Sequence, residues 1–122
     1  MMAGIKGRDT TPERLVRSFL HKAGLRYRLQ VKGLPGRPDI VLPRWGAVVL
    51  VHGCFWHRHA NCSKAATPAT NSAFWQRKFT DNVARDARNV AALRRLGWRV
   101  YVVWECRLSP QALDALVRKI RK

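Results

Sequence analysis

Acidic residues are scarce in this sequence. Seven Asp and Glu stand against 24 Lys and Arg, which gives a formal net charge of +17. The usual partner of such a charge is a polyphosphate, either DNA or RNA, and a basic protein held on a ribosome or on an anionic membrane surface is the alternative. The shortage also restricts any site for a hard divalent cation, because such ions prefer carboxylate oxygens. The available carboxylates belong to Asp9, Glu13, Asp39, Asp81, Asp86, Glu105 and Asp114.

Long apolar runs are absent too. No stretch approaches the ~20 apolar residues that cross a bilayer, and the opening residues lack the apolar core of a signal peptide. We therefore expect a cytoplasmic protein with no membrane partner. The 122 residues are 47% hydrophobic, which is enough to bury one core and excludes extensive disorder. A single domain over residues 1–122 is predicted.

Cysteines are few: the three present cannot all pair within one chain, and a reducing compartment disfavours disulfides in any case. Cys54, His59 and Cys62 follow a C-x4-H-x2-C spacing. Cys106 ends another predicted strand, and three thiolates with one imidazole make the tetrahedral set of a structural Zn²⁺ site. The alternative is that Cys54 and Cys106 are small buried hydrophobes and Cys62 an incidental loop thiol. Zinc is favoured because Cys62 lies in an otherwise polar loop.

The spacing of apolar residues switches several times between the helical and the strand period. A helix is predicted from a Thr10 cap to Gly24, and strands are predicted over residues 26–31, 40–42 and 47–51, the last two as a hairpin. A helix over residues 72–96, a strand over 98–104 and a helix from Ser109 follow. This order predicts an α/β fold with a mixed central sheet flanked by helices.

Asp39, preceded by Pro38, fits the opening of the P-D…(D/E)-x-K pattern of restriction-type nucleases. The second half of that pattern lies on the next strand, yet residues 47–51 hold neither an acid nor a lysine. The ordinary motif is therefore absent, and one carboxylate would have to share Mg²⁺ with backbone carbonyls, phosphate oxygens and water. The alternative for Asp39 is a turn residue beside a proline.

A histidine and a second acid can supply what the missing motif lacks. His57 is left over by the zinc set, and a neutral imidazole can take a proton from water near pH 7. Asp86 falls beside the inward apolar stripe of the long helix, where it can hold His57 or help to place the metal. The alternative for His57 is an ordinary loop histidine. The alternative for Asp86 is an ion pair with Arg85 or Arg88. The stripe consists of Phe79, Val83, Ala87, Val90 and Leu93.

Four segments carry a recognisable pattern. They read L-P-G-R-P-D at residues 34–39, V-H-G-C-F-W-H at 51–57, F-W-Q-R-K-F-x-x-N-V-x-R-D at 74–86, and L-G-W-R-V-x-V-V-W-E-C at 96–106. Together they resemble the very short patch repair (Vsr) DNA mismatch endonucleases of bacteria. The resemblance extends from Met2 to Leu108. It implies a restriction-endonuclease-like fold, a variant of the PD-(D/E)xK class.

The resemblance also assigns roles around a catalytic centre. It implies that Asp39 binds catalytic Mg²⁺, with the backbone carbonyl of Val51 as an additional ligand. His57 would be the general base and Asp86 its active-site companion. Glu13 matches an acid that lies near the site in the family. The structural zinc ligands that it implies are Cys54, His59, Cys62 and Cys106.

Contacts to DNA are implied as well. Phe55, Trp56 and Trp75 match aromatic residues that wedge into the duplex beside the mismatch. Insertion of a side chain between base pairs costs a few kcal/mol of unstacking, and the cost is least at a mismatch. Ordinary core packing is the alternative for these aromatics. Lys78 and Asn82 match residues that contact the mispaired bases.

The residues and the resemblance together predict a Mg²⁺-dependent DNA endonuclease that nicks one strand at a T:G mismatch, the product of 5-methylcytosine deamination. Its expected partner is double-stranded DNA with that mismatch. Mismatch-repair proteins are candidate partners, and a monomer is expected. Two rival hypotheses are a non-catalytic zinc-stabilised DNA-binding module and a restriction-fold nuclease of other specificity.

Overall fold

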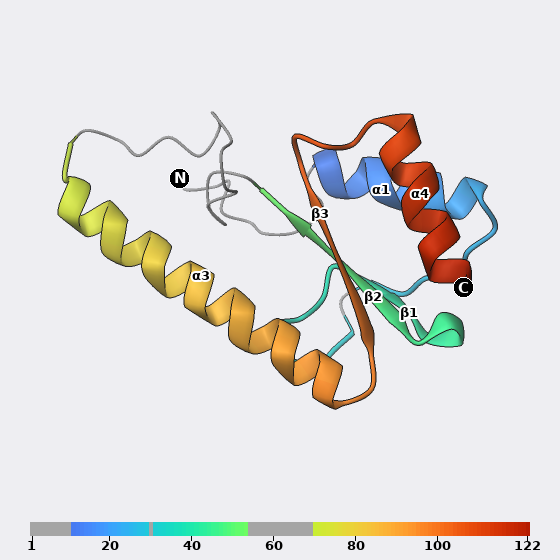
Figure 1. Ribbon diagram of the computed structural model, residues 1–122, viewed down its shortest axis with the longest axis horizontal. Helices are drawn as coiled ribbons and strands as arrows, with labels where there is room; N and C mark the ends of the chain where they lie inside the picture. The colour runs from blue at the N-terminus through green and yellow to red at the C-terminus, as the bar shows by residue number, and fades with distance from the viewer. Residues whose placement is uncertain (1–10, 30, 54–69) are drawn as a thin grey trace.

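The computed structural model describes residues 11–29, 31–53 and 70–122, and Figure 1 shows their arrangement. A small mixed sheet crosses the centre, with helices on both of its sides, as predicted for the α/β class. The elements in chain order are α1 (Thr11–Lys22), β1 (Ile40–Leu42), the 3-10 helix η2 (Pro43–Trp45), β2 (Ala47–His52), α3 (Ser72–Arg95), β3 (Arg99–Trp104) and α4 (Pro110–Arg121).

The sheet has three strands in the order β1, β2, β3. β1 and β2 form the predicted hairpin, in which Ile40 lies opposite Val49. β2 and β3 run parallel, with Val49 beside Tyr101 and His52 beside Trp104. The connection between these parallel strands contains α3, which lies on the other side of the sheet from α1 and α4 (Figure 1). The C-terminal ends of β2 and β3 therefore lie next to each other.

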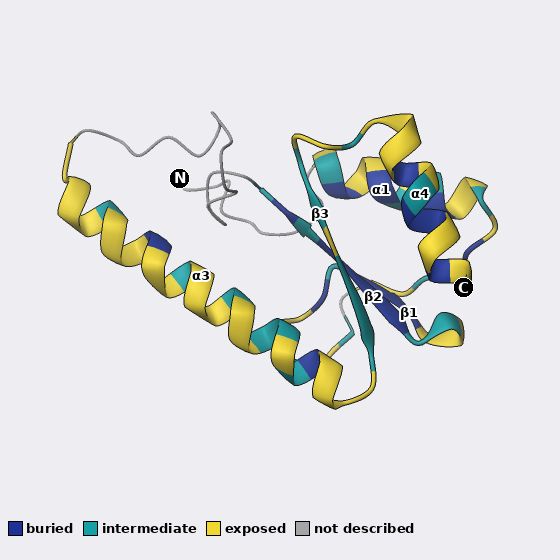
Figure 2. Ribbon diagram, in the orientation of Figure 1, coloured by how far each residue is buried: buried dark blue, intermediate teal, exposed yellow. Residues whose placement is uncertain are grey.

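The core has two parts, because side chains along a strand point alternately to its two faces. Ile40 and Val49 join α1 and α4 in the larger part. Val41 and Val48 pack with Leu93 of α3 in the smaller part. All five side chains are almost completely buried, and Figure 2 shows the buried residues concentrated in β1 and β2. β2 reads as an unbroken apolar run because both of its faces are covered.

α3 is longer than the sheet that it packs on, which corrects the prediction of a continuous inward stripe. Its 24 residues span about 36 Å, whereas the six residues of β2 reach only about 20 Å. Phe79 and Leu93 are buried as predicted, but Val83 is 45% exposed and Ala87 is also exposed. Val83, Ala87 and the half-buried Val90 line an open groove beside β3 instead of a closed core.

The strand predicted over residues 26–31 is wrong. In the described part of that segment, ladder pairing is limited to one antiparallel bridge between Arg28 and Val41. Each residue donates its N–H to the carbonyl of the other, at 2.7 and 2.9 Å. β1 can pair with little more, because Pro38 lies two residues before it and Pro43 follows it directly, and a proline has no N–H for a ladder.

The predicted helix boundaries are confirmed where the structure describes them, and they have local causes. Gly24 and Gly97 follow α1 and α3 with φ angles of +85° and +96°, the left-handed conformation in which glycine commonly ends a helix. The Ser109 hydroxyl accepts a hydrogen bond from the Ala112 N–H at 3.1 Å at the start of α4. The predicted Thr10 cap lies outside the described residues. Within the described ranges, none of the helices has the length and apolar character needed to cross a membrane.

Arg99, the first residue of β3, ties the sheet to the end of α4. Its guanidinium donates to the carbonyl oxygens of Trp45 and Ile120, both at 2.8 Å, and to that of Lys119 at 3.2 Å. The last carbonyls of a helix lack intrahelical donors and carry the negative end of the helix dipole. Arg99 therefore satisfies the end of α4 and holds it against the hairpin.

Replacing Arg99 by Met should lower the free energy of unfolding by about 2–3 kcal/mol, because half-buried carbonyls lose a charged donor. Urea unfolding followed by circular dichroism measures the change. Arg88→Met removes an exposed arginine from α3 and should stay within about 0.5 kcal/mol of the parent protein. Equal unfolding midpoints for the two variants would contradict this role of Arg99.

Candidate active site

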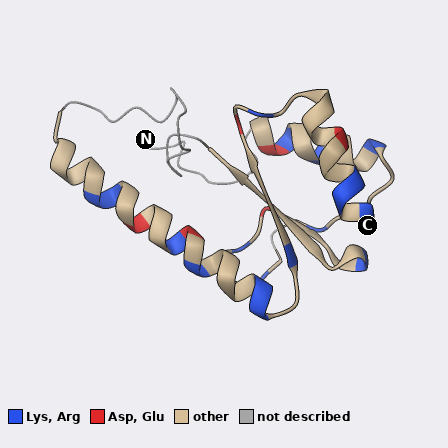
Figure 3. Cartoon of the chain, viewed as in Figure 1, with Lys and Arg blue, Asp and Glu red and all other residues tan. Residues whose placement is uncertain are grey.

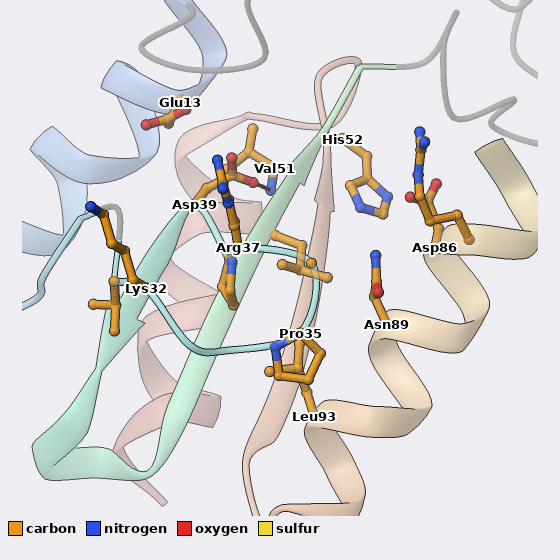
Figure 4. Close-up of a pocket in the computed structure, with 15 residues that line it drawn as sticks. Glu13, Lys32, Pro35, Arg37, Asp39, Val51, His52, Asp86, Asn89 and Leu93 are labelled. Carbon is orange, nitrogen blue, oxygen red and sulfur yellow. Dashed lines mark hydrogen bonds between the residues drawn. The ribbon is translucent and has the colours of Figure 1, made fainter.

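A cavity of about 360 Å³ lies at the end of the sheet where β1 begins and β2 ends. Its walls come from α1, from the segment before β1 and from α3, as Figure 4 shows. Figure 3 shows how few acids the described chain carries, and the whole sequence has only seven. Three of them gather here with three cations and one histidine. The charged lining consists of Glu13, Asp39, Asp86, Lys32, Arg37 and Arg85, and the histidine is His52.

Asp39 is held in place by the backbone of β2. The N–H of Val51 donates to the Asp39 Oδ2 at 2.7 Å. In a strand, the N–H and C=O of one residue point to the same edge, whereas the His52 carbonyl points to the other edge and accepts from Glu105 at 3.0 Å. The Val51 carbonyl therefore lies on the Asp39 side of β2. One carboxylate and one backbone carbonyl are oxygen ligands of the kind that Mg²⁺ prefers, so this pair could hold the ion.

Glu13 reaches the same cavity from the first turn of α1. The residue is only 5% exposed, and its carboxylate lies 3.4 Å from the Arg17 Nη1 one helical turn later. Burial of a carboxylate is costly without such a partner. The structure thus places Glu13 beside the cavity that contains Asp39, and the family resemblance implies an acid near the site at this position.

Asp86 and His52 lie next to each other on the α3 side of the cavity (Figure 4). His52, the last residue of β2, is 8% exposed, and its ring meets that of Trp104 edge to face at 5.2 Å between centroids. His52 was not among the site residues predicted from the sequence. The period of two along a strand could have found it, because Leu50 and His52 share one face and a polar residue there extends an apolar row into the site.

The turn over residues 33–38 forms a wall of the cavity. The Leu34 carbonyl accepts from the Arg37 N–H at 3.2 Å, and Gly36 has a φ of +73°. With Pro35 as the second residue, these features match a type II turn. A Cβ placed on Gly36 would lie 2.7 Å from the Asn89 side chain of α3. The missing side chain therefore lets the turn and α3 close together around the cavity.

One face of α3 leads from the cavity toward the N-terminal end of the helix. Trp75, Lys78 and Asn82 precede Asp86 at intervals of three and four residues, so all four fall within an arc of about 80°. Trp75 is half buried and stacks on Phe79 with 5.7 Å between ring centroids, while Lys78 is exposed. The structure thus aligns the three predicted DNA contacts of this helix with the predicted active-site acid.

Six predicted site residues lie outside the described residues: Cys54, Phe55, Trp56, His57, His59 and Cys62. Cys106 follows β3 by two residues and is exposed. β2 and β3 end in register, with His52 beside Trp104. The chain therefore leaves the sheet at neighbouring points after these two residues. The parts of the chain that the structure describes contain no group of three His, Cys, Asp or Glu residues suited to a metal ion, so the predicted zinc set is not complete within them.

The fold resembles that of a solved nuclease. The catalytic domain of the homing endonuclease I-Bth0305I aligns with 93% of this chain and 93% of its own length, with a TM-score of 0.59 and 22% sequence identity. At that identity the likeness concerns the fold alone. This chain therefore has the fold of that nuclease domain, a mixed sheet between helices, with its charged cavity at the strand ends.

Sequence comparison identifies the family. The family DNA mismatch endonuclease Vsr matches residues 1–64. The type II nicking enzyme V.XorIIP of Xanthomonas oryzae is 48% identical over 121 residues, covering 98% of this chain and 88% of its own. The DNA mismatch endonuclease Vsr of Escherichia coli is 47% identical over 107 residues, which cover 88% of this chain and 68% of that enzyme. The chain belongs to the Vsr family of DNA mismatch endonucleases and is a DNA endonuclease, as its four sequence segments predicted.

The packing of the cavity wall can be tested at its glycines. Gly36→Ala should lower the free energy of unfolding by about 2 kcal/mol or more, because left-handed strain of about 1 kcal/mol adds to the clash with Asn89. Gly33→Ala is the matched control, since Gly33 has a φ of +89° and no atom within 4 Å of the added Cβ. It should cost only about 1 kcal/mol. Equal losses in urea unfolding would mean that Gly36 does not join the turn to α3.

Proposed function

We propose that this endonuclease nicks one strand of duplex DNA at a T:G mismatch in a Mg²⁺-dependent reaction. The observation that carries the proposal is the Val51 hydrogen bond to Asp39, which fixes one carboxylate at the end of β2 inside the cavity. Family membership supports action on mismatched DNA. The T:G pair and the metal are those that the sequence resemblance implies.

Asp39 and the Val51 carbonyl would hold the metal. One Asp39 oxygen accepts from the Val51 N–H, which holds the carboxylate beside the Val51 carbonyl. When bound, Mg²⁺ supplies positive charge that stabilises the negative charge accumulating on the phosphate during hydrolysis. Glu13 and Asp86 lie around the same cavity, and a role in orienting water or bound phosphate follows from that position.

Proton transfer is assigned to histidine. His57, five residues after β2 in the sequence, would take the proton of the attacking water, and Asp86 would orient the imidazole or the water. His52 is a second imidazole beside Asp86 in the cavity, so it shares this assignment as a group that can hold a proton close to the phosphate. Hydrolysis would leave 5′-phosphate and 3′-hydroxyl ends.

Mismatch recognition is assigned to aromatic wedges and to one face of α3. Phe55, Trp56 and Trp75 would insert beside the mispaired bases, where unstacking costs least. Lys78 and Asn82 would contact the bases, and their alignment with Asp86 supports a duplex that runs along α3 into the cavity. The excess of basic residues supplies general attraction to the phosphate backbone.

A structural zinc ion is proposed between the strand ends. Cys54, His59, Cys62 and Cys106 would be its ligands, and it would hold the segment that carries Phe55, Trp56 and His57 against the ends of β2 and β3. Metal analysis of protein purified without chelator should find about one zinc ion per chain. Cys106→Ser should lose most of it, while His21→Ala, at an exposed histidine of α1, should keep it. Far less than one zinc ion in the parent protein would refute the site.

Strand nicking tests the function. The parent protein with Mg²⁺ should nick a labelled duplex beside the T of a single T:G pair, and leave the matched C:G duplex intact. Asp39→Ala and His57→Ala should lower the single-turnover rate by a factor of about 10² or more, because metal binding and proton transfer are lost. His52→Ala should lower it as well.

Asp114→Ala is the matched control, because it removes an exposed carboxylate from α4, away from the cavity. Its nicking rate should equal that of the parent. Tight binding to the mismatched duplex without any nick would favour a non-catalytic binding module. Equal nicking of matched and mismatched duplexes would favour a nuclease of other specificity.

A further inference from the structure

Arg37 has a backbone conformation that is unfavourable for its residue type. Its φ is +47°, a left-handed value that residues with a Cβ rarely adopt. Pro38 follows it, and a residue before proline normally takes an extended conformation. The surrounding turn imposes the conformation through the hydrogen bond to Leu34 and the burial of Pro38. Strain of this kind persists where the structure fixes it and is concentrated at functional sites.

The conformation keeps the Arg37 side chain at the cavity. The side chain lines the cavity together with Asp39 and Val51, and in Figure 4 it extends alongside β2 toward that pair. Arg37 is exposed, and no described residue forms a hydrogen bond or an ion pair with its guanidinium. A guanidinium that a strained backbone holds in position, and whose N–H groups have no partner among the described residues, is suited to bind an anion from outside the protein.

The other two cations of the lining differ from Arg37. Arg85 donates to the Asn82 side chain of its own helix at 2.7 Å. Lys32 carries a single ammonium group on a flexible stem. Arg37 presents a planar fork that can donate two parallel hydrogen bonds to one phosphate, and its backbone is fixed by a turn that packs on α3.

The charges of the cavity create a need for such a group. A phosphate that enters meets the carboxylates of Glu13, Asp39 and Asp86. Arg17 already pairs with Glu13, and a divalent ion at Asp39 offsets two negative charges. The remaining negative charge, that of the phosphate itself, has to be balanced by the cations that line the cavity.

We propose that Arg37 is the phosphate-binding residue of this site. Its guanidinium donates to the non-bridging oxygens of one DNA phosphate at the cavity, positions that phosphate against Asp39, and stabilises the added negative charge during hydrolysis. No proton moves to or from Arg37. The inference rests on the proposed function, because that function places the DNA backbone in this cavity.

A set of duplexes tests the contact without requiring a nick. Each duplex carries the T:G pair and one uncharged methylphosphonate in place of a phosphate near the expected nick, and binding is measured in Ca²⁺, which takes the same oxygen ligands. Neutralising one particular phosphate should weaken the parent about tenfold. Arg37→Asn should bind the unmodified duplex about tenfold more weakly than the parent does. Its affinity should not fall further when that particular phosphate is neutralised. Arg44→Asn, an exposed arginine at the far end of the hairpin, should behave as the parent.

Rate and stability complete the test. Arg37→Asn should lower the single-turnover nicking rate about a hundredfold with unchanged or higher stability, because asparagine tolerates the left-handed conformation. A variant as sensitive as the parent at every phosphate would overturn the inference, and so would a variant that merely unfolds more easily. If the parent does not nick but the phosphate-specific loss depends on Arg37, the proposed nicking activity fails, while the contact between Arg37 and the phosphate stands. If the parent nicks and Arg37→Asn nicks equally fast, the inference fails and the function stands.

Discussion

The hydrogen bond from the Val51 N–H to Asp39 is the constraint on which the arrangement of this site depends. It joins β2 to the residue just before β1, at a point where the ladder between the two strands has already ended. The Asp39 carboxylate is thereby fixed beside a backbone carbonyl. In the proposed mechanism this pair holds the metal, for which other restriction-type nucleases use two acids, and histidine takes the place of their lysine.

Basic and acidic residues are distributed differently over the structure. Lys and Arg occur on α1, α3 and α4, so basic residues lie on both sides of the sheet (Figure 3). General attraction to DNA therefore extends well beyond the cavity. The acids are few, and three of them gather around one strand end. The place of the chemistry is set by where the acids meet, and in our proposal Arg37 supplies the positive charge that a phosphate needs among them.

Most elements could be predicted because their causes are local. Gly24 and Gly97 end helices by their own conformational freedom, Ser109 caps its helix, and residues 47–51 carry the apolar run of a doubly covered strand. The wrong predictions concern residues whose structure depends on segments that are distant in the sequence. Residues 26–31 have the alternation of a strand but pair with a β1 that two prolines keep short. Val83 has the spacing of a core residue but lies on a helix longer than its sheet.

By itself, the sequence determined the family, the α/β class and the candidate acids Glu13, Asp39 and Asp86, because motifs and periodicity are properties of the chain alone. Only the tertiary structure decided that these acids share one cavity, that His52 joins them, and that the turn before Asp39 closes on α3 through Gly36. The physical reason is sequence separation: α1, the hairpin and α3 meet only when the sheet brings their ends together, and no local pattern encodes that contact.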